Sequence, residues 1–512
     1  MELYVTHVLH RNRQRRPDQA CLVDGVGVAT HDEVAARVAA LAGGLRASGV
    51  GAGDRVAIVA ANSARYVEAL FAILWAGAIA CPVNHRLAPR EVLDLLGGVG
   101  ASAVFVDGTC PVPADGLRPG VRTVVDLTGG PGTSGTVPYE EMARSDAIPD
   151  SGRSGDDIAL LLSTGGTTGR AKQAALSHAN VVSAGLAQLA AGSGTGEVFV
   201  HVAPLFHLAG MQMMVTHLLG GGGPQAFLPR FTPDGFMAAV EAHRATDTLL
   251  VPTMLRTVLA APARAGFDLT SLRRIFYGAA PMPGDLLEQA ATALPSAGFV
   301  QGYGMTETLL TVTLPPEAHS AAARRRGLTR SVGRAHPGVD VSIRDAAGAE
   351  LPTGEVGEIA VRGPSVMRGY YGDPDATREV VREGWLYTGD GGRMDAEGYL
   401  YLADRIKDMI VTGGENVFSV EVEDVLLGHP EVEQAAVIGI PDGTWGETVH
   451  AIVVAAPGAA ARPAGIRDFC RERLAGYKCP RTVEFRDALP LSAAGKVLKA
   501  QLRAESSTTG PR

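Results

Sequence analysis

The chain has 512 residues, more than one hydrophobic core usually serves, so we expect at least two domains. Hydrophobic residues make up 46% of the chain and charged residues 20%, a globular balance that excludes long disordered stretches. The formal net charge of -8 would repel a phosphate backbone, so nucleic acid is not an expected partner. An anionic substrate must therefore be held by local groups.

The cysteine pattern and the N-terminal segment indicate the compartment. The five cysteines are few and lack metal-ligand spacing, which indicates free thiols in a reducing environment. The N-terminal segment has no apolar stretch after its basic residues, so no secretory signal is predicted. The longest apolar stretch, residues 69–83, is short for a membrane span and is typical of a buried helix that leads into a strand. We therefore expect a cytoplasmic protein with no membrane span.

The first half of the chain alternates helical and strand patterns. Apolar residues spaced three and four apart predict a helix across residues 34–45 that ends at Gly49. Residues 56–60 and 103–106 are short apolar runs typical of buried strands, and residues 66–75 predict a second helix between them. This alternation predicts α/β layers with largely parallel sheets.

Two later regions differ from the first half in composition and pattern. Residues 107–156 are rich in Gly, Pro, Asp and Thr, and we predict irregular surface structure there. From residue 400 the pattern predicts a strand, a charged connector, a second strand, a glycine turn and a helix. A small α+β unit of about a hundred residues fits this C-terminal part.

A glycine- and threonine-rich segment follows a predicted strand at residues 158–162 and ends at Lys172. Glycines let backbone amides approach an anion, threonine hydroxyls add donors, and the lysine supplies positive charge, so the segment can hold phosphate. It is not the P-loop of kinases, because Lys172 comes three residues after Gly169 and Gln173 follows it. Taken alone, the segment is equally compatible with a glycine-rich surface turn.

The segment resembles the signature loop of the adenylate-forming superfamily, which includes acyl-CoA synthetases, adenylation domains of peptide synthetases and firefly luciferase. That pattern usually has glycine after the lysine, where this chain has Gln173. We expect a stiffer loop end or a slightly shifted Lys172, without loss of phosphate binding. The resemblance implies that ATP is bound by Thr164, Gly165, Gly166, Thr167, Thr168, Gly169 and Lys172.

Residues 204–210, Pro-Leu-Phe-His-Leu-Ala-Gly, resemble the segment that lines the acyl pocket in acyl-CoA synthetases. A lone histidine beside apolar residues is more often a satisfied core residue. The resemblance nevertheless implies a catalytic role for His207, as a pocket wall and a gate for the thiol tunnel. The acyl-pocket residues that it implies are His207, Met211, Gly278, Gly302 and Gly304.

Residues 277–281, Tyr-Gly-Ala-Ala-Pro, end an apolar run and resemble the strand beside the adenine. Small residues would let the purine lie against the backbone, and the alternative is an ordinary transition from strand to turn. The resemblance implies that Gly278, Ala279 and Ala280 contact ATP.

Residues 301–307, Gln-Gly-Tyr-Gly-Met-Thr-Glu, are the most specific segment after the loop. The flat ring of Tyr303 can cover adenine, and a neighbouring hydroxyl and carboxylate can hold Mg²⁺ bridged to phosphates. The resemblance implies that Thr306 contacts phosphate and that Glu307 is the magnesium ligand. The alternative is a helix N-terminus capped by Thr306, which is compatible with both roles.

Residues 387–390, Tyr-Thr-Gly-Asp, resemble the ribose motif. An aspartate can accept two hydrogen bonds from a cis-diol, and the resemblance implies that Asp390 binds the ribose of ATP. In the charged segment that follows, Arg405 corresponds to a residue near ribose and phosphate, and Lys407 corresponds to the hinge. Without the resemblance, this charged segment is a solvated linker.

Two C-terminal motifs complete the set. Residues 411–417 resemble the glycine turn that enters the site during thioester formation, where Gly413 and Gly414 would line the path of coenzyme A because a side chain would obstruct it. Residues 489–499 resemble the C-terminal lysine motif, which implies that Lys496 is the key catalytic residue and contacts ATP. A lysine so near a terminus is otherwise typical of a solvated surface.

Together the motifs extend from residue 158 to residue 499 in the order of the superfamily. They imply that ATP activates a carboxylic acid to an acyl-adenylate with release of pyrophosphate, and that the acyl group then passes to coenzyme A. ATP, Mg²⁺ and coenzyme A are the implied cofactor and co-substrates. Two alternatives stay open: the acceptor thiol belongs to a separate acyl carrier protein, or the chain is a non-catalytic nucleotide-binding protein on the same fold.

The implied architecture is α/β, with a large N-terminal domain of layered, mostly parallel sheets and helices at residues 1–402 that holds ATP and the acid. A hinge at 403–407 would connect it to a small mobile α+β domain at 408–512 that carries Lys496. Rotation about Lys407 would withdraw Lys496 and bring in the glycine turn.

The acid itself is the least determined part. Residues 207–211 and the glycine run at 220–223 predict a roomy, mostly apolar pocket. This favours a medium-chain, aryl or alicyclic acid over acetate or an amino acid, because no buried carboxylate for an ammonium group is evident.

Overall fold

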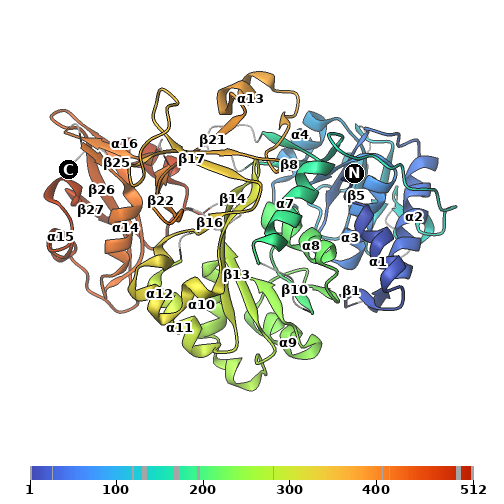
Figure 1. Ribbon diagram of the computed structural model, residues 1–512, viewed down its shortest axis with the longest axis horizontal. Helices are drawn as coiled ribbons and strands as arrows, with labels where there is room; N and C mark the ends of the chain where they lie inside the picture. Colours follow the sequence, from blue (N-terminus) through green and yellow to red (C-terminus); the bar gives the residue numbers. More distant parts are fainter. Residues whose placement is uncertain are drawn as a thin grey trace.

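The protein is described by a computed structural model over residues 3–25, 27–117, 120–129, 135–164, 172–192, 197–280, 282–405, 408–413, 415–491 and 497–508. Three of its sheets belong to a large N-terminal part, and a fourth belongs to a small C-terminal part that lies at the left of Figure 1.

The first sheet contains nine strands within the described residues, and its central strands run parallel. Strand β14 also pairs antiparallel with β15, so the sheet is mixed at this edge. The strands in spatial order are β16 (Arg334–Ala335), β15 (Leu309–Leu314), β14 (Gly298–Met305), β13 (Arg274–Gly278), β12 (Asp247–Leu249), β10 (Phe199–His201), β11 (Gln225–Phe227), β1 (Ala20–Asp24) and β2 (Gly27–Thr30).

The second sheet contains eight described strands and is parallel from β8 to β7. Two antiparallel strands, β9 and β19, extend it beyond β8. The spatial order is β19 (Gly369–Tyr370), β9 (Gln173–Ser177), β8 (Ile158–Ser163), β4 (Ile79–Pro82), β3 (Arg55–Val59), β5 (Ala101–Val106), β6 (Thr123–Asp126) and β7 (Val137–Pro138).

Two helices lie between these sheets, α7 (His178–Ala190) and α8 (Leu208–Gly220) (Figure 1). Their apolar residues join the core of the second sheet, while α8 also contacts β10 and α7 contacts β15. None of the helices in the described part of the chain combines the length and apolar character that crossing a bilayer requires. Helix α3 (Ala64–Trp75) is also buried and contacts β3 and β4 of the second sheet and β1 of the first. The other helices of the large part include α1 (His7–Arg15), α2 (His31–Ala47), α4 (Pro89–Val99), α9 (Pro233–His243), α10 (Pro252–Ala260) and α11 (Gly284–Ala293).

Local sequence signals account for several of these boundaries. Helix α2 begins with a capping box, in which the Glu33 amide donates to the Thr30 hydroxyl at 3.2 Å and the Thr30 amide donates to the Glu33 carboxylate at 2.8 Å. It ends before Gly49, whose φ of +82° is the left-handed conformation that glycine adopts without strain. The helices expected at residues 34–45 and 66–75 are therefore present as α2 and α3, and the expected strands are present as β3, β5 and β8.

The prediction of irregular surface structure for residues 107–156 is wrong in part. This region supplies β6 and β7 to the second sheet, together with two short helices, α5 (Ala114–Leu117) and α6 (Tyr139–Met142). Val124, Val125 and Tyr139 are buried in it. Its strands are only four and two residues long, too short for periodicity to distinguish them from turns.

The remaining sheets lie toward the C-terminus. The third sheet is antiparallel and consists of β17 (Asp340–Arg344), β18 (Gly357–Arg362), β20 (Val381–Arg382), β21 (Trp385–Met394) and β22 (Leu400–Arg405), with α13 (Pro374–Val380) beside it. The small C-terminal domain contains β23 (Ile410–Thr412), β24 (Glu415–Val417), β25 (Val432–Asp442), β26 (Gly446–Ala455), β27 (Thr482–Phe485), α14 (Ser419–Leu427), α15 (Pro463–Arg471) and α16 (Lys499–Thr508). The α/β fold with a large and a small domain is therefore as predicted; the exact hinge limits stay a prediction.

Five buried histidines predict that the fold loses stability in mild acid. Burial lowers the pKa of His178, His217, His319 and His336 to about 4, and that of His201 to about 3. Unfolded histidine titrates near pH 6.5, so between pH 6.5 and 4 the unfolded chain binds more protons and folding is progressively disfavoured as pH falls. The thermal unfolding midpoint should drop from pH 7 to pH 5.

One variant pair isolates this effect. The Nε2 atom of buried His336 lies 2.7 Å from the Thr313 hydroxyl, a contact that glutamine can also make. The variant His336→Gln should therefore show a weaker dependence of the unfolding midpoint on pH. Replacing exposed His243 by glutamine should leave that dependence as in the wild type. Equal slopes in both variants would contradict the assignment.

Candidate active site

The motifs singled out from the sequence lie where parallel strands end. Strand β8 ends at Ser163, directly before the glycine-rich loop, while β13 ends at Gly278 and β14 ends at Met305. Ligands of parallel α/β sheets bind outside the carboxyl ends of the strands. The local chain order therefore puts two glycine-rich turns and an acidic turn at ligand-binding edges.

The loop of residues 164–172 is closed at its base by a hairpin. The Thr164 amide donates to the Lys172 carbonyl at 2.9 Å, and β8 and β9 pair Ser163 with Gln173. The Gln173 carboxamide donates to the Ser163 hydroxyl at 2.9 Å, and that hydroxyl lies 3.2 Å from the Gln173 Oε1. Gln173 thus ties the two strands by a side-chain contact that glycine could not make. The predicted phosphate-binding residues inside the loop, Gly165, Gly166, Thr167, Thr168 and Gly169, lie outside the described residues.

Lys172 and Glu307 are brought near one another through Tyr370. The Lys172 ammonium lies 4.8 Å from the centroid of the Tyr370 ring, and the Tyr370 hydroxyl donates to the Glu307 Oε1 at 2.8 Å. Burial and the Glu307 carboxylate raise the pKa of Tyr370. The sequence analysis missed Tyr370; the only local signal is its place in the turn-like segment Gly-Tyr-Tyr-Gly at 369–372.

The segment after β14 is a tight turn, so the alternative of a helix capped by Thr306 is wrong. The Thr308 amide donates to the Met305 carbonyl at 3.0 Å, and β15 begins at Leu309 with a φ of +58°. This left-handed conformation is strained for leucine and is typical of functional sites. Within the turn, Thr306 is half-buried and Glu307 is 5% exposed.

Tyr303 and Asp390 meet although 87 residues separate them. The Tyr303 hydroxyl donates to the Asp390 Oδ2 at 2.9 Å. The ring of Tyr303 packs in a small apolar cluster of the third sheet, and Asp390 is paired in register with Arg405 across β21 and β22. The structure therefore joins the predicted adenine and ribose residues, whose contacts with ATP stay predictions. The side chain of Arg405 is not among those described.

The glycines of β13 and β14 are required by close packing of the backbone. A Cβ at Gly278 would lie 2.5 Å from the Gly302 carbonyl oxygen, and a Cβ at Gly304 would lie 2.0 Å from the Leu309 carbonyl oxygen. Ala279 follows with a φ of +64°, a conformation uncommon for alanine. These contacts explain the small residues without a ligand. The predicted roles of Gly278, Gly302, Gly304, Ala279 and Ala280 in binding therefore remain untested.

Of the two residues predicted from the Pro-Leu-Phe-His segment, one is half-buried and one is in the core. His207 is the residue that precedes α8, and its ring centroid lies 5.5 Å from that of Phe206. Met211, one turn into α8, is 2% exposed and packs with the core of the second sheet. His207 therefore keeps the exposure that a gate needs, whereas Met211 contributes to packing.

An apolar cluster missed by the sequence analysis lies on the face of the first sheet that meets α8. It consists of buried Phe199, Met213, Phe276 and Val300, with Leu249 packed against them. Phe276 and Val300 precede Gly278 and Gly302 by two positions, so they lie on the same face of their strands as these glycines. The Phe199 and Phe276 rings are stacked with centroids 6.3 Å apart. A packed apolar core therefore lies beneath the strand ends.

In the C-terminal domain the predicted thiol-path residue Gly413 has a φ of +61°, and its amide donates to the Trp445 carbonyl at 2.9 Å. A Cβ there would lie 2.7 Å from the Trp445 ring, so packing alone requires glycine. Gly414, Lys407 and Lys496 lie outside the described residues. The segment that contains Lys496 is closed by a bridge between Leu491 and Val497.

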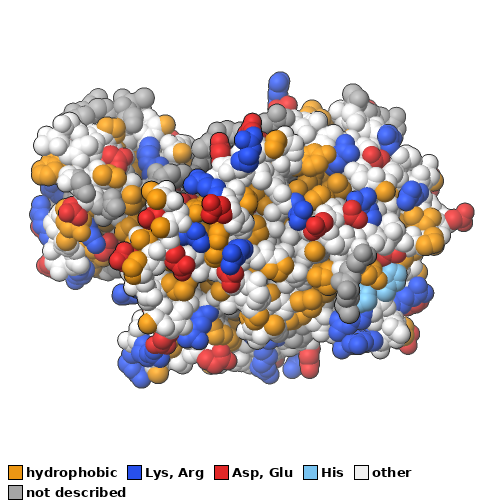
Figure 2. Space-filling view, turned by 45° about the horizontal axis from the view of Figure 1, so that its top comes forward, with side chains coloured by type: hydrophobic (Ala, Val, Ile, Leu, Met, Phe, Trp, Pro, Cys, Tyr) orange, Lys and Arg blue, Asp and Glu red, His pale blue; other side chains and the backbone are white. Residues whose placement is uncertain are grey.

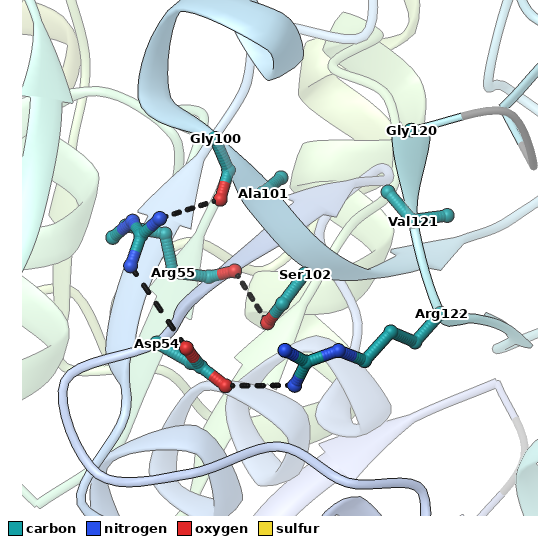
Figure 3. Close-up of a pocket in the computed structure, with 8 residues that line it drawn as sticks. All are labelled: Asp54, Arg55, Gly100, Ala101, Ser102, Gly120, Val121 and Arg122. Carbon is teal, nitrogen blue, oxygen red and sulfur yellow. Dashed lines mark hydrogen bonds and ion pairs between the residues drawn. The ribbon is translucent and has the colours of Figure 1, made fainter.

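A surface pocket of about 380 Å³ lies at the opposite ends of the second sheet, where β3, β5 and β6 begin (Figure 3). Its charged groups satisfy one another: the Arg122 guanidinium donates to Asp54 at 3.1 Å, and that of Arg55 donates to the Gly100 carbonyl at 2.9 Å. The pocket is therefore distinct from the site formed by the motifs. On the face shown in Figure 2, basic and acidic side chains are interspersed.

Comparison with known sequences gives one family. Its profiles are described as AMP-binding enzyme, which matches residues 9–371, and as AMP-binding enzyme C-terminal domain, which matches residues 421–496. The chain is 40% identical over 495 residues to a feruloyl-CoA synthase of Amycolatopsis sp, which covers 96% of this chain and 97% of the relative. It is 35% identical over 482 residues to an indoleacetate–CoA ligase of Aromatoleum aromaticum, which covers 93% of this chain and 92% of the relative.

Among solved structures, the chain is similar to the amide bond synthetase McbA from Marinactinospora thermotolerans. The TM-score is 0.88 at 32% sequence identity, and the match covers 98% of this chain and 99% of that chain.

The base of the loop yields a prediction about Gln173. Gln173→Ala should raise the KM for ATP about fivefold, because one net hydrogen bond contributes about 1 kcal/mol to holding the loop. Ser163→Ala should have the same effect, and the double variant should be no worse than either single variant. Steady-state kinetics of ATP-dependent pyrophosphate exchange measures this coupling, and strictly additive effects would contradict it.

Proposed function

The chain belongs to the AMP-binding enzyme family and is an ATP-dependent ligase that joins a carboxylic acid to coenzyme A; from this premise we propose that the acid carries an aromatic or alicyclic ring. The apolar cluster of Phe199, Met213, Phe276 and Val300 carries the proposal. The flexible Met213 side chain of α8 now fills this cluster, and its displacement would let a flat ring pack against the Phe199 and Phe276 rings. Two curated relatives named for ring-bearing groups, the feruloyl-CoA synthase and the indoleacetate–CoA ligase, support the same class, although other relatives at 34–36% identity are named for fatty acids.

The first half-reaction joins two anions, so charge neutralisation and positioning are its main demands. A carboxylate oxygen attacks the α-phosphorus of ATP, the bond to the bridging oxygen breaks, and pyrophosphate leaves. Lys172 and the loop it closes would hold the β- and γ-phosphates, and Thr306 would contact phosphate. Asp390, held by Tyr303, would accept hydrogen bonds from the ribose.

The turn after β14 fits a magnesium ion. Mg²⁺ prefers oxygen donors and is usually held by one or two carboxylates, substrate phosphates and water. Glu307 supplies a carboxylate that Tyr370 orients, and Thr306 adds a hydroxyl beside it. No cluster of three His, Cys, Asp or Glu side chains able to hold a metal occurs among the described residues. When bound, Mg²⁺ would offset the charge that develops on pyrophosphate.

The second half-reaction needs a different arrangement of the small domain. The acyl-adenylate is a mixed anhydride; the thiol sulfur of coenzyme A attacks its carbonyl carbon and AMP leaves with the bonding electrons. We propose that Lys496 serves only the first step, and that rotation about Lys407 replaces it by the turn at Gly413 and Gly414. An acyl carrier protein as acceptor has less support: one relative, 36% identical over 470 residues, is named as a fatty acid–acyl-carrier-protein ligase, whereas the feruloyl, indoleacetate and long-chain-fatty-acid relatives are named for coenzyme A.

A panel of acids tests the proposed substrate class. Pyrophosphate exchange and acyl-CoA formation should be roughly tenfold more efficient for aryl-propenoic and aryl-acetic acids than for straight-chain acids of equal carbon number, since apolar pocket contacts discriminate on this scale. Preference for a straight chain would refute the ring proposal.

Two phenylalanine variants locate the ring site. Phe276→Leu should lower kcat/KM for a ring acid while leaving the KM for ATP unchanged. Phe299→Leu removes the same atoms from the opposite face of the sheet, where Phe299 is buried among outer-helix contacts, and should not alter acid preference. A selective loss in Phe299→Leu would place the acid elsewhere.

The role of Lys496 is separable by half-reaction. Lys496→Ala should reduce adenylate formation about 100- to 1000-fold, the usual cost of removing one charge-stabilising donor. Thioester formation from a supplied acyl-adenylate should be unchanged. Lys499→Ala is the control, because Lys499 pairs with Glu423 at 2.7 Å within the same domain. Equal loss of both half-reactions in Lys496→Ala would exclude the rotation.

A further inference from the structure

The strand that carries Tyr370 is fixed directly beside the phosphate loop. Strand β19 pairs antiparallel with β9, with Tyr370 opposite Ala174, two positions beyond Lys172. The Tyr371 amide donates to the Gln173 carbonyl at 2.8 Å, and the Tyr370 amide donates to the Thr377 hydroxyl of α13 at 2.8 Å. The backbone at Tyr370 is therefore held on both sides, which leaves little freedom for its ring.

The same short segment is also attached to the acidic turn of the other sheet. The Met367 amide donates to the Glu307 carbonyl at 2.8 Å, three residues before Tyr370 donates to the Glu307 carboxylate. Both the backbone and the side chain of Glu307 are thus bound by one segment. Residues 367–371 consequently connect the second sheet, which carries the loop, with the first sheet, which carries the acidic turn.

One aromatic side chain contacts both charged groups. The ring faces the Lys172 ammonium at 4.8 Å, an attractive cation–π distance, while its hydroxyl holds the Glu307 carboxylate. An ammonium and a carboxylate so close would otherwise attract one another and fill the space that phosphate oxygens and a metal ion need. A rigid ring that contacts both keeps them apart and oriented.

We propose that Tyr370 is a positioning residue, which spaces the phosphate-binding Lys172 from the magnesium-binding Glu307 before ATP arrives. The proposal rests on the function proposed above. Its ring acts on the lysine and its hydroxyl acts on the carboxylate, so the two contributions can be removed one at a time.

Tyr370 also lines a surface pocket of about 520 Å³, together with Tyr371 and Arg368.

Calorimetric titration with α,β-methylene ATP, which cannot react at the α-phosphorus, tests the proposal without turnover. In Tyr370→Phe the metal-free affinity should stay as in the wild type, while the gain in affinity on adding Mg²⁺ should fall about tenfold, since a hydrogen bond to a charged group is lost. In Tyr370→Leu the metal-free affinity should fall as well. The KM for the acid should be unchanged in Tyr370→Phe.

The adjacent tyrosine provides the matched controls. Tyr371 is 39% exposed and donates its backbone amide to Gln173, a bond that side-chain replacement keeps, so Tyr371→Phe and Tyr371→Leu should leave both affinities unchanged. An unaltered Mg²⁺ increment in Tyr370→Phe would overturn the proposal. Failure of the wild type to form an acyl-adenylate with any acid would instead overturn the proposed function, so the two failures are distinguishable.

Discussion

Repulsion between a carboxylate and a triphosphate is the constraint on which this structure depends. The net charge of -8 offers no general attraction for either anion, so positive and polar groups must converge locally. Two of the groups proposed to do so, Lys172 and Glu307, lie beside strands of two sheets that share no hydrogen-bonded edge among the described strands. Residues 367–371 resolve this, because they pair with β9 on one side and bind Glu307 on the other. A peripheral two-residue strand thereby fixes the distance between the charged parts of the site.

In the first sheet, the ends of β13 and β14 and the residues two positions earlier differ in polarity. At the ends of β13 and β14, glycines bring the backbones into contact, so only main-chain groups and the following turn face a ligand there. Two residues earlier on the same face, Phe276 and Val300 present apolar surface toward α8. The alternation of a β-strand thus gives a polar edge for phosphate chemistry above a lining suited to the body of the acid. The aryl or alicyclic acid proposed here follows from that lining rather than from the charged edge.

Local signals in the sequence were sufficient for much of the fold and for the position of the motifs. The capped helix α2 and the apolar strands β3, β5 and β8 were predicted because their patterns are complete within a few residues. Strands β6 and β7 were not, since they are short and are stabilised by pairing with β5 rather than by their own composition. The sequence Thr306-Glu307 after β14 is compatible with a helix start as well as with a turn, because a threonine followed by an acidic residue occurs in both. Tyr370 could not be found at all, since its importance arises from a pairing between residues nearly two hundred positions apart.

The departure at Gln173 can be understood from the same pairing. Glycine at this position leaves the base of the loop held by backbone contacts alone, whereas Gln173 adds a bond to Ser163 across the hairpin and keeps its carbonyl for Tyr371. The contacts of Gln173 lie at the base of the loop, beside the segment that carries Tyr370; a stiffer loop end or a shifted Lys172 stays a prediction. Neither the Ser163–Gln173 contact nor the Gln173–Tyr371 hydrogen bond involves the C-terminal domain. Under the proposed mechanism, withdrawal of the C-terminal domain removes the contacts of Lys496. Lys172 and Glu307 stay in place during this movement. The same site can therefore serve two successive reactions.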